Sequence, residues 1–327
     1  MDLVRSYLDV FESLRAESKW GQSAEIQRFV ALVLASTRLT DPARELKECE
    51  AVLTASNGWF SGVRPPVSTV LAAVVLRRGL DPRGMLKRVE AMQDRFKQRG
   101  MSRAQISGLM AAFLLVTSHP DGDVSDATLD RMKYILAAWT ADHWWLTGAD
   151  DYPMAALHTL RDEPIAELCT RIEGIYQALR AQGHGRGNQL QLVSHVLAVA
   201  PWQSQEAVDR FQALINAFQR REVPIKSERL DEVALLSLSS GSADAIAGQV
   251  ISAMSRLLDV KPKPGKTTAF ALAAGLVMAE SSKSADAGDL QAAQAIAAIV
   301  AAQTAAMVAV IAAVSASSAA SSAAAAG

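Results

Sequence analysis

The sequence predicts an all-α protein built as a repeat array of about seven helical hairpins, followed by a long Ala-rich C-terminal helix. Three observations lead to this prediction. A short apolar run returns about every 40 residues, an amphipathic helix lies between successive runs, and helix-starting and helix-ending residues stand at the joints. A fixed period of this size is typical of repeat proteins, in which each hairpin stacks on its neighbours.

The apolar run marks the inner helix of each predicted hairpin. Its seven copies start 41, 39, 44, 40, 38 and 39 residues apart, at Ala31–Ser36, Ala72–Arg77, Ala111–Val116, Ala155–Leu160, His195–Ala200, Val233–Leu238 and Leu272–Val277. Because these runs are apolar on nearly every side, we expect each of them to be buried inside the stack.

The second helix of the hairpin has one apolar face. Its apolar residues stand three or four positions apart, which places them on one side of an α-helix. The stripes are Leu86, Val89, Met92 and Phe96; Leu129, Met132, Ile135 and Trp139; Leu168, Ile172, Ile175 and Leu179; Val208, Phe211, Leu214 and Phe218; Ile246, Val250, Met254 and Leu257. One hairpin alone leaves such a stripe in water, so we expect stacking to supply the stability.

Capping residues stand at the expected joints. Asp41-Pro42 and Asp81-Pro82 place an N-cap acid before a proline at the first helical position, where the missing N–H costs nothing. Glu163-Pro164 and Ala200-Pro201 place a proline at the same point of their units. Gly100 and Gly183 follow second helices, where a left-handed glycine ends many helices.

The first helix, roughly Asp2 to Arg15, is interpreted as a half-unit that caps the array, with seven inner helices and about fifteen helices in all. We expect a helical-hairpin repeat domain over residues 1–284 and an Ala-rich C-terminal helix and tail over residues 285–327. An open α-solenoid is the favoured architecture, and a closed α/α toroid is the alternative. Spacing alone does not separate the two.

The tail carries no charged residue from Leu290 to Gly327. Its larger apolar residues form a heptad seam with one polar position, at Ile296, Val300, Gln303, Met307, Val310 and Val314. The favoured interpretation is packing on the chain's own last hairpin, and self-association through residues 290–314 is the next. A membrane span is the least favoured, because alanine contributes little to insertion.

Composition narrows the functional class. The formal net charge is −1, from 33 basic and 34 acidic residues, so we expect no nucleic-acid partner. Cys49 and Cys169 form neither a disulfide framework nor a zinc motif, and free thiols are typical of a reducing compartment. The first residues lack a signal-peptide pattern. Together these features predict a cytoplasmic protein.

The densest polar and aromatic segment runs from Trp139 to His158 and predicts a candidate binding site. A ligand pocket with aromatic walls, including Trp145, and with the paired carboxylates of Asp150 and Asp151 is one interpretation. The alternative is structural: Asp151 caps a helix that begins near Pro153, and the tryptophans fill a seam between repeats.

His158 and His195 lie on inner helices of consecutive units, so we expect them to approach each other across the stack. Two histidines and a carboxylate are able to hold a metal, but spacing fixes no third ligand, and hydrogen-bonded core histidines are the favoured interpretation. We predict no metal and no cofactor. Asp121, Asp123 and Asp126 resemble the start of a calcium loop, but Met132 stands where the final acid belongs, and helix capping is the better account.

Three segments resemble the bacterial domain-of-unknown-function 4003 family: Leu146–Leu157, Ile175–Leu179 and Leu192–Ala198. Thr147 through Pro153, with the pattern Thr-x-x-Asp-Asp-Tyr-Pro, is the most specific part, and the likeness extends over nearly the whole chain. The resemblance implies a bacterial, helical, single module and transfers no mechanism. It makes Thr147, Asp150, Asp151, Tyr152 and His195 the first residues to mutate.

Three functions fit these features. The leading hypothesis is an interaction or scaffold protein that binds a protein or peptide on its concave face and self-associates, since stacked hairpins offer such surfaces. One alternative is an enzyme or a metal- or ligand-binding protein, with its site around Asp150, Asp151, His158 and His195. The other alternative is a membrane-associated protein held by the C-terminal helix.

Overall fold

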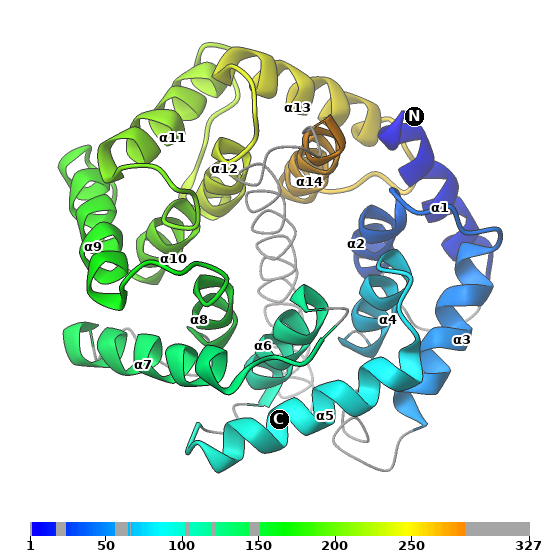
Figure 1. Cartoon of the computed structure of the whole chain (residues 1–327). Helices are drawn as coiled ribbons and strands as arrows, with labels where there is room; N and C mark the ends of the chain where they lie inside the picture. The colour runs from blue at the N-terminus through cyan, green and yellow to red at the C-terminus, as the bar shows by residue number, and fades with distance from the viewer. Residues whose placement is uncertain are drawn as a thin grey trace, which may run out of the picture. The chain divides into compact units, whose positions relative to one another are not determined.

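The computed structural model describes residues 2–17, 24–55, 65, 67–101, 105–119, 122–143 and 151–284. These residues form fourteen α-helices and one 3-10 helix, with no strand among them, which confirms the all-α prediction (Figure 1). The helices are α1 (Leu3–Glu17), α2 (Ala24–Leu34), α3 (Pro42–Thr54), α4 (Val67–Arg77), α5 (Pro82–Gln98), α6 (Gln105–Ser118), α7 (Asp126–His143), α8 (Tyr152–His158), α9 (Ile165–Ala181), α10 (Asn188–Leu197), α11 (Ser204–Gln219), η3 (Ser227–Arg229), α12 (Leu230–Ser237), α13 (Ala243–Leu258) and α14 (Lys266–Ser284).

The chain divides into two compact units with the boundary inside α5. Among the described residues, the first unit extends to Met92 and the second begins at Gln93. The predicted tail, residues 285–327, and its seam at residues 290–314 lie outside the described residues, so the boundary at residue 284 stays a prediction. The choice between an open solenoid and a closed toroid stays a prediction too.

In the first unit, two helical hairpins stack side by side. Helix α1 pairs with α2 and α3 pairs with α4, while α2 also packs on α4 and α1 on α3. The apolar face predicted for the first helix is buried, with Tyr7 and Phe11 stacked at 6.1 Å between ring centroids. Arg28 of α2 lies over the Phe11 ring at 5.3 Å. The first helix therefore forms a full hairpin with α2, whereas the sequence predicted a half-unit.

In the second unit, the helices form an inner and an outer series (Figure 1). The inner contacts run from α6 to α8 and from α10 through α12 to α14, and the outer contacts run from α7 through α9 and α11 to α13. Each outer helix also contacts the inner helix that follows it in the chain. This is the packing of a solenoid-like array.

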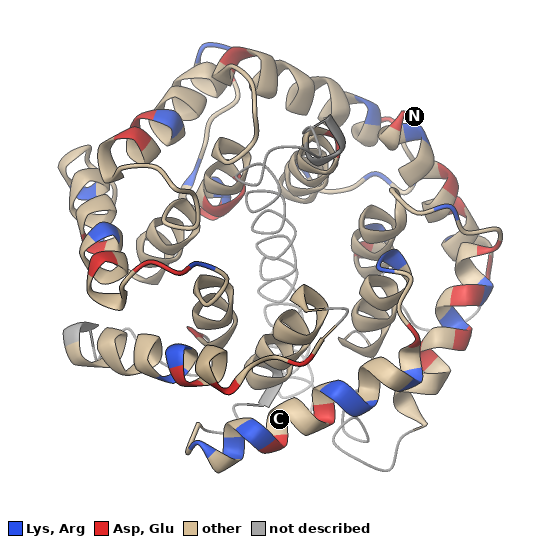
Figure 2. Ribbon diagram, viewed as in Figure 1, with Lys and Arg blue, Asp and Glu red and all other residues tan. Residues whose placement is uncertain are grey.

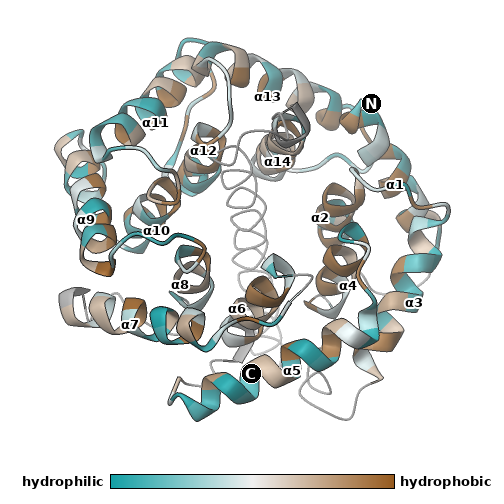
Figure 3. Ribbon diagram, viewed as in Figure 1, coloured by the Kyte–Doolittle hydropathy of each residue, from teal (hydrophilic) through white to brown (hydrophobic). Residues whose placement is uncertain are grey.

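The predicted apolar runs fall on α2, α4, α6, α8, α10, α12 and α14, and four of them continue just past the end of the helix. Every residue of α8 is buried. The outer helices expose their charged faces and bury their predicted stripes (Figures 2 and 3). Met254 is the exception: it is half-buried, and Ala253 takes the buried position on α13.

The helix starts confirm part of the capping prediction. The Asp41 carboxylate accepts a hydrogen bond from the Arg44 backbone N–H at 3.1 Å, and Asp81 accepts one from Gly84 at 2.6 Å. The prediction for the other two prolines was wrong. Pro164 is the N-cap of α9 and not its first residue, and α11 starts at Ser204, after Gln203, so Pro201 lies in the preceding turn.

The helix ends follow the prediction. Gly100 and Gly183 have φ values of +71° and +91°. The following residue donates its backbone N–H five positions back, from Met101 to Phe96 at 3.0 Å and from His184 to Leu179 at 3.3 Å. This is the Schellman arrangement, which satisfies carbonyls at a helix C-terminus.

An arginine on each of four outer helices binds backbone carbonyls at or beyond the end of the next inner helix, and we call these contacts arginine clips. Arg95, Arg131, Arg171 and Arg210 donate to Val124, Glu163, Ala198 with Ala200, and Ser237 with Ser239, respectively. Arg171 and Arg210 bind carbonyls at the C-terminal ends of α10 and α12, where a cation offsets the negative end of the helix dipole and satisfies orphan carbonyls. Arg95 and Arg131 instead bind carbonyls in the turns that precede α7 and α9. The clips therefore fasten each outer helix to the end of the inner helix that follows it, or to the turn after that inner helix.

Candidate functional site

The candidate site is a cavity of about 1060 Å³ in the second unit, between α7, α9 and α10. Helix α9 contributes the longest wall: Ile165, Ala166, Cys169, Thr170, Ile172, Glu173, Tyr176, Gln177 and Arg180. The other walls come from α7, α10 and the turn before α10: Ala138, Trp139, Ala141, Arg186, Gly187, Gln191, Ser194 and His195. The cavity therefore opens along the side of α9 that faces α7.

The cavity has an apolar end and a polar end. Helices α9 and α10 are antiparallel neighbours joined by residues 182–187, so the end of α9 and the start of α10 share one end of the hairpin. Arg180, Arg186 and Gln191 lie at that end. Ile165 and Ala166, at the start of α9, lie at the other end of this wall. An occupant with one polar end matches this lining.

Trp139, His158 and His195 form a buried ring cluster at the cavity wall. The centroid of the Trp139 ring lies 4.2 Å from that of His195 and 5.7 Å from that of His158, in an edge-on arrangement with the latter. The two histidine rings are 5.8 Å apart. Trp139 and His195 line the cavity, whereas His158 lies behind them. Aromatic side chains from α7, α8 and α10 thus pack together in one cluster.

His158 is fully buried, and neither ring nitrogen has a hydrogen-bond partner within the described residues. Burial lowers the pKa of His158 well below its ordinary value, and His195 and the nearby cations of Arg171, Arg161 and Arg131 lower it further. Loss of hydration and like charges both disfavour the imidazolium. His158 is therefore a neutral core ring near neutral pH.

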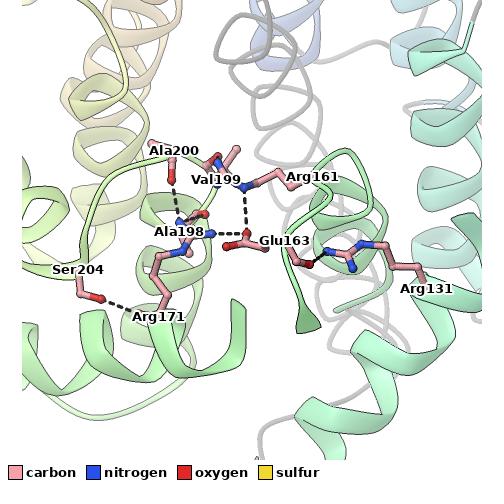
Figure 4. A network of polar contacts seen from close by, with 8 residues as sticks. All are labelled: Arg131, Arg161, Glu163, Arg171, Ala198, Val199, Ala200 and Ser204. Atoms are coloured by element: carbon pink, nitrogen blue, oxygen red, sulfur yellow. Dashed lines mark hydrogen bonds and ion pairs between the residues drawn. The ribbon is translucent and has the colours of Figure 1, made fainter. Parts of the chain in front are cut away.

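A charged network holds the helices that frame the cavity (Figure 4). The Glu163 carboxylate accepts hydrogen bonds from Arg161, at 2.9 Å, and from Arg171. The Glu163 backbone carbonyl accepts from Arg131 of α7 at 2.6 Å, while Arg171 also reaches the carbonyl of Ala200 at 2.7 Å. Two arginine clips thus meet at Glu163. The network fixes α7 and α9 to the end of α10.

On its other side, α9 packs tightly against α11. A Cβ atom at Gly174 would lie only 3.0 Å from the Ser204 hydroxyl, and that hydroxyl donates to the Arg171 carbonyl at 3.2 Å. The side of α9 that faces α7 differs, because it lines the cavity. The unit containing α7 has the longest repeat spacing, 44 residues, and its inner helix α8 is only seven residues long. The cavity lies where the repeat is least regular.

The structure places the predicted site residues in different positions. Trp145, Thr147 and Asp150 lie outside the described residues. Asp151 stands at the N-cap position of α8 without a side-chain capping bond, and Tyr152 is the buried first residue of that helix. His158 and His195 come together as expected, and of the described candidates only His195 lines the cavity.

The main cavity residues that the sequence did not indicate are on α9 and the turn after it. Cys169, Tyr176 and Arg180 lie beside the predicted stripe of α9 and were not singled out. A signal was present, because Ile165, Ala166, Cys169 and Tyr176 widen the apolar face of α9 beyond one stripe. A wide apolar face on an outer helix indicates a second contact surface.

The calcium-loop pattern has a structural explanation. Ser125 caps α7 by accepting a hydrogen bond from the Thr128 backbone N–H at 3.1 Å. Asp126 receives Arg95 at 2.5 Å and Arg99 at 2.6 Å, and these hydrogen bonds lower the pKa of Asp126. Among the described residues, no three His, Cys, Asp or Glu side chains are grouped to hold a metal ion.

No helix in the described part of the chain has the length and hydropathy needed to span a bilayer. Neither curated proteins nor solved structures give a significant match. One family model does match, over residues 10–305, and its description is "Protein of unknown function (DUF4003)". The match covers most of the chain and agrees with the resemblance seen in the sequence. The chain therefore belongs to the DUF4003 family.

Proposed function

We propose that this protein binds a small, elongated amphipathic molecule in the cavity between α7, α9 and α10. The observation behind the proposal is the cavity itself, which has one apolar and one polar end. Its volume, about 1060 Å³, matches the upper range of small-molecule pockets, roughly 300–1,000 Å³. This proposal follows the ligand-binding alternative of the sequence.

The expected shape of the ligand follows from α9. The lining residues of this helix run from Ile165 to Arg180, fifteen residues along the axis. At 1.5 Å per residue, the wall is about 22 Å long. Trp139 and Tyr176 add aromatic surface along it, and such side chains supply much of the binding energy at low entropic cost. An extended molecule fits this wall better than a compact one.

Binding of a neutral apolar probe tests the proposal. The fluorescence of N-phenyl-1-naphthylamine should rise when it is titrated with the protein, because apolar pockets shield the probe from water. Ala166→Phe fills the cavity and should weaken binding at least tenfold. Ala245→Phe, on the exposed face of α13, is the matched control and should bind as the parent does. Equal affinities for the two variants would refute the proposal.

The native cysteines provide a second readout. Cys169 lines the cavity, whereas Cys49 is buried in the first unit. Alkylation of Cys169 by N-ethylmaleimide, followed by mass spectrometry, should slow when the probe is bound. Cys49 serves as an internal reference, because its alkylation should not respond to the probe. Unchanged alkylation of Cys169 at saturating probe would place the probe elsewhere.

The other sequence hypotheses stay predictions. They are a protein or peptide partner on the concave face, self-association through residues 290–314, an enzyme around Asp150 and His195, membrane association through the C-terminal helix, and a cytoplasmic location. A partner on the concave face would be expected to bind the Ala166→Phe variant and the parent equally. The same pair of variants therefore separates the cavity ligand from such a partner.

A further inference from the structure

We infer that the polar end of the cavity binds an anionic group, so that the ligand is an anionic amphiphile, specifically a long-chain carboxylate. The inference rests on the proposed function, because it assigns the ligand class of the same cavity. It places the carboxylate at the turn between α9 and α10 and the alkyl chain along α9 toward Trp139 and Ile172.

Two arginines at this turn have no side-chain partner among the residues that the structure describes. Arg180, in the last turn of α9, and Arg186, in the turn itself, both line the cavity. Within the described residues, neither makes a hydrogen bond or an ion pair. Arg171 and Arg210 of the same unit are instead committed to backbone carbonyls. A guanidinium without a partner is able to bind a carboxylate through two parallel hydrogen bonds.

Gln191 is an independent observation that points to a ligand at the same end. Its side chain lines the cavity on α10 and is only 8 % exposed. Its amide makes no hydrogen bond within the described part of the chain. The amide thus opens into the cavity, where a ligand acceptor is able to accept a hydrogen bond from the Gln191 side-chain N–H group.

The start of α10 also favours a negatively charged ligand group. This helix of ten residues begins after Gly187, which lines the cavity and offers no side-chain cap. The first backbone N–H groups of a helix lack intrahelical partners, and the helix dipole places partial positive charge there. Helix starts of this kind bind anions. Two arginines, one amide and a helix start thus converge on one end of the cavity.

The charge balance of the lining agrees. Glu173 is the carboxylate among the described lining residues, against the two arginines. It lies seven residues before Arg180, about 10 Å along the helix, and accepts a hydrogen bond from Gln177 at 2.6 Å. The negative charge is therefore separated from the anion end. Beyond it the lining is largely apolar, which suits an alkyl chain.

The test compares the binding of dodecanoate, its methyl ester and dodecyl phosphate, each below its aggregation concentration. Binding is measured in two ways: by protection of Cys169 from N-ethylmaleimide and by displacement of bound N-phenyl-1-naphthylamine. Dodecanoate should bind at least tenfold tighter than the ester. Arg180→Met with Arg186→Met should reduce dodecanoate binding to the level of the ester and leave the ester unchanged. Gln191→Leu should weaken the binding of dodecanoate several-fold. Arg83→Met, on the exposed face of α5, is the control and should change nothing.

Equal binding of dodecanoate and its ester, or an unchanged preference in the double variant, would overturn the anion inference and leave the cavity proposal standing. Loss of binding by the neutral probe and the ester as well would overturn the proposed function itself. Tighter binding of dodecyl phosphate than of dodecanoate, lost in the double variant, would support the anion subsite and identify phosphate as its group. Protection by a peptide with a free carboxylate, without protection by dodecanoate, would overturn the long-chain class.

Discussion

His158 shows how a single residue can lie in a candidate site and serve packing. Its ring is fully buried, and both ring nitrogens lack partners within the described residues. The side chain therefore contributes shape rather than hydrogen bonds, in contact with Trp139 and His195. The sequence marked it as a candidate ligand because residue type alone does not reveal the state of a histidine.

The titration of His158 gives a prediction about acid stability. Its pKa is lowered in the folded state by burial and by nearby positive charge, whereas the unfolded chain takes up a proton near pH 6.5. The stability contributed by the neutral ring is therefore lost as the pH falls below about 6.5, with a slope of up to about 1.4 kcal/mol per pH unit. His158→Leu should remove this slope and cost less than about 1.5 kcal/mol at pH 7.5.

Urea unfolding of the parent and His158→Leu at pH 7.5, 6.5 and 5.5 measures both effects. Identical pH slopes in the two proteins would contradict a depressed pKa. A large loss at pH 7.5 would instead show that the ring nitrogens have partners in solution.

Glu222 occupies a position that glycine fills elsewhere. It follows α11 with a φ of +60°, and Val223 donates to the Phe218 carbonyl at 3.0 Å, as in the turns at Gly100 and Gly183. A residue with a Cβ atom is strained at positive φ. Glu222→Gly should therefore stabilise the protein by about 0.5–1 kcal/mol. The control Gly183→Ala should destabilise it, and thermal unfolding of both variants checks the signs.

At the scale of the element, the arginine clips explain the order of the outer series. Each clip ties an outer helix to the chain at or just after the inner helix that follows it, so a similar contact recurs at every repeat from Arg95 to Arg210. The sequence contained this signal, since each of these arginines directly precedes a residue of the predicted stripe, such as Phe96 or Phe211. Hydrophobic periodicity did not detect it, because an exposed arginine and a clipped one look alike in sequence.

Replacing one clip should destabilise its joint. Arg210 donates to Ser237 at 3.2 Å and to Ser239 at 3.0 Å, and lies over the Trp202 ring at 4.3 Å. Arg210→Lys keeps the charge but loses the two-point contact, so we expect a loss of about 1–2 kcal/mol. Arg44→Lys, in an exposed i,i+4 pair with Glu48, is the control and should change stability by less than about 0.5 kcal/mol. Chemical denaturation compares the two.

The start of α12 predicts a pH effect of the opposite sign. Burial, together with the adjacent Asp231, raises the pKa of Glu232 to about 9. The folded state therefore holds a proton that the unfolded state has released, and stability should fall as the pH rises from about 5 toward 9. Glu232→Gln mimics the protonated form and should gain roughly 1–2 kcal/mol over the parent at pH 8.5. Equal stability of the two at pH 8.5 would contradict this account.

For the whole molecule, periodicity predicted the all-α class, the seven apolar runs and most buried stripes, because burial in stacked hairpins recurs at a fixed spacing. The cavity was not predictable in the same way. It depends on how far α7 stands from α9, and its traces in the sequence are indirect: the 44-residue spacing between the apolar runs of α6 and α8, and the widened apolar face of α9. The segment from Trp144 to Asp150, on which much of the predicted site rested, lies outside the described residues.

Serial stacking also predicts how the molecule unfolds. Each hairpin contacts mainly its neighbours, so a defect should spread along the chain only through those contacts. Phe11→Ala, in the core of the first unit, removes a ring that is 1 % exposed and should cost about 3–4 kcal/mol locally. Hydrogen exchange should then rise in α1 to α4 and stay unchanged in α9 to α13. Phe211→Ala, in the second unit, should give the reverse pattern. If either substitution raised exchange equally across both units, the chain would unfold as one cooperative body, and stability would not be a sum over neighbouring hairpins.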